Sequence, residues 1–128
     1  MAAGPRMAEK TILCVDDSPT VLLSMTNALT QVGYNVITAA DGEEALLKAL
    51  ESAPDLVLLD VVLPQRKGFQ VCRLLKSSPA TKDIKVFLVT SKTQDADRYW
   101  GIRQGADAYL TKPFNTDDLL RVVEEHLQ

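Results

Sequence analysis

The run Leu56-Val57-Leu58-Leu59, followed directly by Asp60, is the segment that indicates the class of fold. Its four apolar residues are consecutive and do not alternate with polar ones, so a strand here has both faces covered. Such strands are typical of parallel sheets that lie between two layers of helices. Four more short apolar runs read as strands, at residues 12–15, 35–38, 86–89 and 108–110.

Segments with helical periodicity separate these runs, and their ends carry capping signals. Ser18 before Pro19 opens the first helix, which Gly33 ends. Asp41 with Glu44 three residues later predicts a capping box for the second. The five expected helices cover residues 19–32, residues 43–52, the stretch from just after Gly68 to near Ser77, residues 93–104 and, after a cap at Asn115 or Thr116, the stretch to residue 128.

Five strands that alternate with five helices predict an α/β fold with a doubly wound parallel sheet. The strand order that we expect is 2-1-3-4-5, as in flavodoxin-like folds. A chain of 128 residues fits one domain, and we assign residues 9–128 to it. Residues 1–8, with Gly4, Pro5 and a second methionine, are interpreted as a disordered leader or cloning remnant.

The composition limits what the protein binds and where it works. Seventeen acidic and 14 basic residues give a net charge of -3, unlike the basic surface of nucleic-acid-binding proteins. No apolar run approaches the roughly 18 to 20 residues of a membrane span. Cys14 and Cys72 lie in apolar stretches, which indicates buried cysteines in a reducing compartment. We therefore expect a cytoplasmic protein without membrane insertion or direct nucleic-acid binding.

Polar side chains follow four of the five expected strands: Asp16 and Asp17, Asp60, Thr90, and Lys112. In the order 2-1-3-4-5, the first and third strands are neighbours at the edge where ligands bind. The three carboxylates should therefore meet in one crevice and require a cation. Oxygen ligands without His or Cys favour Mg²⁺ over zinc.

Thr90 and Lys112 would complete a site for an anionic phosphoryl group, with a hydroxyl and an ammonium as donors. Asp60, at the centre, is placed to take that group as an aspartyl phosphate. Each residue alone also has a structural interpretation, because Asp is common in turns and caps and Lys-Pro is a common exit from a strand. Because all of them are expected at one edge of the sheet, a functional site is favoured over these structural interpretations.

Over residues 10–128 the chain resembles the receiver domain of two-component response regulators. The matching segments are Val15-Asp16-Asp17-Ser18, Asp60 with Pro64 and Gly68, Val89-Thr90-Ser91, and residues 105–114. Residues 16–20 and 100–105 are most similar to stand-alone receivers of chemotaxis-like and type IV pilus twitching pathways.

The resemblance implies a phosphorelay role. Asp60 would accept the phosphoryl group from a sensor histidine kinase or a phosphotransfer domain. Mg²⁺ would be held by Asp16, Asp17, Asp60 and the backbone carbonyl of Val62. The protein would not be an enzyme in the usual sense, although it would assist its own phosphorylation and hydrolysis.

The resemblance also implies a conformational switch. Thr90 and Lys112 would bind the phosphoryl oxygens, and Pro113 would follow the lysine through a cis bond. Tyr109 would be the aromatic switch, whose ring moves inward when Thr90 is drawn to the phosphoryl group. The fourth helix, fifth strand and fifth helix would then bind a protein target.

Two features depart from the family pattern. Arg66 and Lys67 put positive charge beside the metal loop, which disfavours Mg²⁺ and attracts an acidic partner unless both side chains point to solvent. Val62 and Lys92, two residues after Asp60 and Thr90, occupy the positions that tune loss of the phosphoryl group. Val62 cannot orient an attacking water, so we expect a long phosphoryl lifetime.

Other functions on the same architecture fit less well. A flavin or nucleotide domain needs a glycine-rich phosphate loop, and none of its motifs occurs. A phosphatase similar to haloacid dehalogenases needs a second Asp where Val62 stands. A phosphorylation-independent docking module remains the alternative, because an intact site can go unused.

Overall fold

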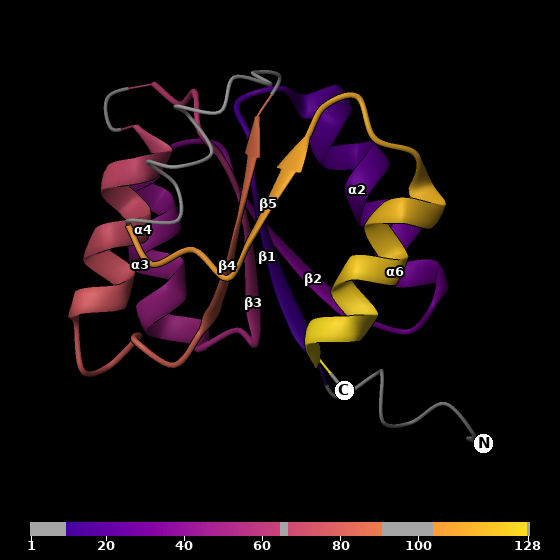
Figure 1. The fold of residues 1–128 in the computed structure, drawn as a ribbon. Helices are drawn as coiled ribbons and strands as arrows, with labels where there is room; N and C mark the ends of the chain where they lie inside the picture. Colours follow the sequence, from indigo (N-terminus) through magenta and orange to yellow (C-terminus); the bar gives the residue numbers. More distant parts are fainter. Residues whose placement is uncertain (1–9, 65–66, 91–103, 128) are drawn as a thin grey trace.

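The computed structural model describes residues 10–64, 67–90 and 104–127 (Figure 1). Five parallel strands form one sheet in the order β2-β1-β3-β4-β5, which confirms the predicted order. Each strand is one or two residues longer than predicted. Their bounds are β1 (Thr11–Val15), β2 (Asn35–Ala39), β3 (Leu56–Asp60), β4 (Lys85–Thr90) and β5 (Ala108–Thr111).

Helices cover both faces of the sheet, as expected. On one face lie α2 (Pro19–Gln31) and α6 (Thr116–Leu127), and on the other α3 (Gly42–Ser52) and α4 (Gly68–Ser77) (Figure 1).

The helix predicted over residues 93–104 lies outside the described residues, apart from Gln104, which is in a turn before β5. The expectations for residues 1–8 and for Arg66 and Lys92 also lie outside them. No described helix is long and apolar enough to cross a membrane.

The central strand β3 is buried along its whole length, as its unbroken apolar run predicted. Leu56 and Leu58 belong to the core cluster under α2 and α6, whereas Val57 and Leu59 belong to the cluster under α3 and α4. Cys14 and Cys72 are buried and free, and burial raises their pKa values to about 12 and about 11. Both therefore act as small apolar residues of the core.

The helix caps follow the predicted residues, with one correction. Glu44 N–H donates to Asp41 Oδ1 at 2.8 Å, but the Glu44 carboxylate accepts from the N–H of Ala40 and not from that of Asp41. The second hydrogen bond of the predicted capping box is therefore made by the residue before the cap, Ala40. At α6, Asn115 Oδ1 accepts from Asp118 N–H at 2.7 Å, so Asn115 is the cap.

An ion pair ties α4 to the start of β5. Lys76 Nζ lies 2.8 Å from Asp107 Oδ2 and donates to the carbonyl oxygen of Ile84. The same carboxylate oxygen accepts from Val86 N–H at 2.8 Å. Burial alone raises the pKa of Asp107, but the Lys76 and Val86 hydrogen bonds and nearby positive charge outweigh it and lower that pKa. These contacts fix the start of β5 against α4 and β4.

We expect Asp107→Asn to lower the free energy of unfolding by about 1 to 2 kcal/mol at neutral pH. Because the folded pKa is lowered, this stability is present above about pH 4 and is lost as the pH falls through the folded pKa. Urea denaturation at pH 7 and at about pH 3 checks this. Asp118→Asn, in an exposed pair with Arg121, is the control with little effect. An equal loss at both pH values would contradict the assignment.

Candidate functional site

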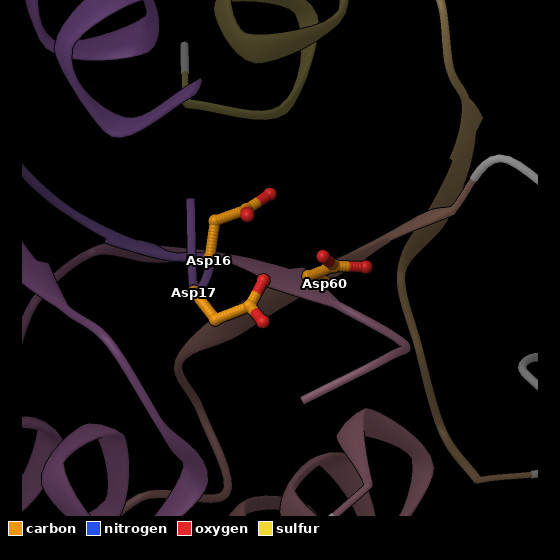
Figure 2. A group of neighbouring side chains, drawn as sticks. All are labelled: Asp16, Asp17 and Asp60. Carbon is orange, nitrogen blue, oxygen red and sulfur yellow. The ribbon is translucent and has the colours of Figure 1, made fainter. Parts of the chain in front are cut away.

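Three carboxylates meet at the carboxyl ends of β1 and β3, as the strand order predicted (Figure 2). Asp16 and Asp17 directly follow β1, and Asp60 is the last residue of β3. One carboxylate oxygen from each residue lies within 4.8 Å of the other two. The juxtaposition exists because β1 and β3 are hydrogen-bonded neighbours although Asp16 and Asp60 are far apart in sequence.

Two of the three carboxylates are removed from solvent and fixed by backbone donors. Asp16 is 2% exposed and Asp60 is 7% exposed, whereas Asp17 is exposed. Ser18 N–H donates to Asp16 Oδ1 at 2.9 Å, and Val62 N–H donates to Asp60 Oδ1 at 3.1 Å. Each fixed carboxylate therefore keeps its second oxygen for another cation or donor.

Lys112 supplies positive charge to those second oxygens. Its Nζ lies 2.8 Å from Asp16 Oδ2 and 3.4 Å from Asp60 Oδ2. Lys112 N–H also donates to the carbonyl oxygen of Thr90 at 2.6 Å, which fixes the lysine beside β4. The Lys112-Pro113 peptide is cis, as the resemblance implied.

The electrostatics of the site show that one lysine does not balance three acids. Burial, and then the charge of Asp16, raise the pKa of Asp60 against the lowering effects of Val62 N–H and Lys112. Burial alone lowers the pKa of Lys112, but its hydrogen bond to Asp16 and the charges of both buried acids raise it overall. The crevice therefore retains an excess of negative charge, and its ligands are oxygens. This donor set fits a hard divalent cation such as Mg²⁺.

Thr90 and Tyr109 lie on neighbouring strands beside this crevice. Thr90 is fully buried at the end of β4, one residue beyond the partner of Asp60 in the sheet register, Val89. Tyr109 is half-buried on β5 opposite Leu88, and its hydroxyl oxygen is shielded from solvent. Its ring packs against the core cluster under α3 and α4. The two predicted switch residues are thus placed in adjacent strands of the sheet.

Gly68 has a structural role that its sequence position alone did not explain. Its N–H donates to the carbonyl oxygen of Val61 at 2.9 Å, which starts α4 directly against the end of β3. A Cβ atom at this position would lie 2.2 Å from the carbonyl oxygen of Asp60 and 2.8 Å from Val61 Cα. The residue must therefore be glycine for the backbone of Asp60 to hold its place. Lys67, just before it, is exposed.

The comparison with known families identifies the family to which this fold belongs. The sequence profile described as "Response regulator receiver domain" matches residues 12–124. The chain belongs to this receiver domain family. Among its relatives, Protein PilH of Pseudomonas aeruginosa is 43% identical over 112 residues, which cover 88% of this chain and 93% of PilH. Protein PilG of the same organism is 36% identical over 116 residues, which cover 91% of this chain and 86% of PilG.

Solved receiver structures agree with the fold. The chemotaxis protein CheY4 of Vibrio cholerae superposes with a TM-score of 0.87 and 33% identity, over 92% of this chain and 98% of CheY4. Receiver domains exchange phosphoryl groups with histidine kinases or phosphotransfer proteins, and they bind Mg²⁺ at an acidic pocket. Asp16, Asp17 and Asp60 form an acidic pocket in this receiver.

A cavity of about 490 Å³ adjoins the acidic pocket of the receiver domain. It lies between the first half of α2 and the segment that follows β5. Lys112 forms part of its wall, so the cavity opens beside the residue that contacts Asp60. Its lining residues are Thr20, Val21, Ser24, Met25, Lys112, Pro113 and Phe114.

Proposed function

We propose that Asp60 is the phosphoacceptor of this receiver domain, with Lys112 and Thr90 as the groups that bind the transferred phosphoryl group. The observation that carries the proposal is the position of Lys112 Nζ, within 3.4 Å of Asp60 Oδ2 and 2.8 Å of Asp16 Oδ2. A cation fixed beside a nearly buried carboxylate is suited to neutralise the charge that phosphoryl transfer brings there.

The reaction is a displacement at phosphorus. A carboxylate oxygen of Asp60 forms the new P–O bond while the P–N bond of the donor phosphohistidine breaks, and the imidazole leaves with the bonding electron pair. Lys112 neutralises the oxygens of the phosphoryl group, and Val62 N–H holds the other oxygen of Asp60. Hydrolysis later returns inorganic phosphate and the free carboxylate, so the protein assists only its own phosphorylation and dephosphorylation.

Asp16, Asp17, Asp60 and the backbone carbonyl of Val62 are the groups that we assign to Mg²⁺. When bound, the ion would offset the repulsion between the carboxylates and the incoming phosphoryl oxygens. Asp16 is held by Ser18 N–H and Asp60 by Val62 N–H, so both ligands are fixed before the ion arrives. Asp17 is exposed and provides the solvent-facing ligand.

A change in target binding would follow from the positions of Thr90 and Tyr109 on the neighbouring strands β4 and β5. Attraction of the Thr90 hydroxyl to the phosphoryl group would favour the inward position of Tyr109 and select the active surface. Within the described residues this surface comprises β5 and α6, and it would bind a protein target.

The cavity beside Lys112 would receive part of the phosphodonor protein, because it opens next to the acceptor. We place this cycle in the cytoplasm, without direct nucleic-acid binding, in a chemotaxis-like or twitching-motility pathway.

Mass spectrometry after incubation with acetyl phosphate and Mg²⁺ tests the proposal. We expect a phosphorylated species of the wild type that disappears in Asp60→Asn and when EDTA removes the metal. Asp55→Asn, a carboxylate at the opposite end of the sheet that accepts from Thr11 N–H, is the matched control and should still be phosphorylated. An unmodified wild type would favour the phosphorylation-independent docking module, and an adduct that persists in Asp60→Asn would move the acceptor elsewhere.

The lifetime of the phosphoryl group is a separate prediction. Val62 is 56% exposed beside Asp60, and its side chain offers water no hydrogen bond. We expect Val62→Asn to speed dephosphorylation by about tenfold, because the amide can orient the attacking water. Phosphate release from the isolated phosphorylated protein measures this, with Val62→Ala as the control that changes size without adding a hydrogen-bonding group. A rate that is unchanged or slower in Val62→Asn would refute the explanation.

A further inference from the structure

Half of the exposed large apolar residues of the described chain lie on two neighbouring helices. Leu47 and Leu50 of α3 are 56% and 58% exposed, and Leu74 of α4 is 39% exposed. Helices α3 and α4 contact each other on the same face of the sheet (Figure 1). None of these leucines belongs to the acidic pocket, to the cavity beside it, or to the β5 and α6 surface.

The three leucines form one patch. In α3, Lys48 points toward the edge strand β2, since its Nζ donates to the carbonyl oxygen of Thr38 at 2.5 Å. With about 100° between successive helical residues, Leu50 then lies on the side of α3 that faces α4. In α4, Lys76 points toward β5, so Leu74 lies on the side that faces α3. Leu50 and Leu74 therefore flank the α3–α4 groove, and Leu47 lies outward above it.

The two rims of this patch carry opposite charge. Exposed Glu51 lies on the α3 rim, and exposed Arg73 lies on the α4 rim. Within the described part of the chain, neither side chain has an ion pair. Glu51 and Arg73 thus place opposite charges on the two rims, with the three leucines between them.

The α3–α4 patch of one copy is complementary to the same patch of a second copy. A two-fold axis that runs along the helices, between α3 and α4, places α3 of one copy against α4 of the other. The leucines of both copies then meet at the centre, and Glu51 of each copy lies on the same side as Arg73 of its partner. Opposite charges at the rim of an interface fix orientation more than they add affinity.

We propose that the α3–α4 patch is a self-association surface, and that the partner it fits is a second copy of this chain. Three exposed leucines are a small apolar area compared with the roughly 800 Å² per partner of stable interfaces. The dimer is therefore weak and forms with a dissociation constant of about 100 µM. It leaves the acidic pocket and the β5 and α6 surface of both copies accessible.

Sedimentation velocity of the full chain, from about 10 µM to about 1 mM, tests the proposal. We expect the weight-average sedimentation coefficient of the wild type to rise with concentration. Leu50→Glu should weaken association at least about tenfold. Leu23→Glu is the matched control, because Leu23 is 62% exposed on α2, on the opposite face of the sheet. Phosphorylation by acetyl phosphate and circular dichroism show that each variant is folded.

A charge exchange tests the geometry. Glu51→Lys and Arg73→Glu should each weaken association about threefold or more, and the double variant should regain most of the wild-type affinity. Glu125→Lys, at an exposed position of α6, controls for the change in net charge. A wild type that stays monomeric throughout, an effect of Leu23→Glu equal to that of Leu50→Glu, or a double variant no better than the singles would each overturn the proposal.

Discussion

Gly68→Ala is expected to lower the free energy of unfolding by about 3 kcal/mol and to slow phosphoryl acceptance by about a hundredfold. The new methyl carbon would lie 2.2 Å from the carbonyl oxygen of Asp60 and 2.8 Å from Val61 Cα. Both obstacles are backbone atoms, so no change of rotamer relieves the overlap. Either α4 moves away from β3 or the backbone of Asp60 shifts, and both responses separate the acceptor from Lys112.

Urea denaturation and the rate of phosphorylation by acetyl phosphate measure these two effects. Gly105→Ala is an informative control, because Gly105 has φ +94 and its nearest side chain is the flexible stem of Lys76. Alanine there costs about 1 to 2 kcal/mol of backbone strain without touching Asp60. We expect it to lose stability and keep its phosphorylation rate. If Gly68→Ala were phosphorylated as fast as Gly105→Ala, Gly68 would have no role in positioning the acceptor.

Lys112→Met is expected to change two properties of the site in opposite directions. Phosphoryl acceptance should fall about 10² to 10³-fold, because the ammonium that contacts Asp60 Oδ2 is lost. Mg²⁺ binding should become tighter by about tenfold, because the same ammonium contacts Asp16 Oδ2 and offsets its charge. Methionine keeps the length and most of the volume of the lysine stem, so the packing around Pro113 is retained.

Isothermal titration with Mg²⁺ and phosphorylation at saturating Mg²⁺ separate the two effects. Lys48→Met removes a lysine whose partners, Glu44 and the carbonyl of Thr38, lie outside the acidic pocket. It should leave Mg²⁺ affinity and phosphorylation near the wild-type values. Weaker Mg²⁺ binding in Lys112→Met would show that the lysine organises the carboxylates and does not compete with the ion.

Local sequence signals predicted most of the fold because their physical causes are local. The unbroken apolar run of β3 requires cover on both faces, and β3 is buried throughout. Ser18 and Asp41 cap their helices because a side-chain oxygen reaches a free N–H three residues on. The capping box predicted that Asp41 N–H donates to the Glu44 carboxylate, whereas the donor is Ala40 N–H. This bond depends on the path of the chain after β2.

Strand ends could be located from the sequence, and this placed one set of polar residues at a single edge of the sheet: Asp16, Asp17, Asp60, Thr90 and Lys112. The folded chain was needed to show that Lys112 Nζ lies 2.8 Å from Asp16 Oδ2, 96 residues away, and that Gly68 packs on the carbonyl of Asp60. The reason is that periodicity and capping arise from neighbours along the chain. Contacts of a few ångströms between distant segments depend on how whole helices pack against the sheet.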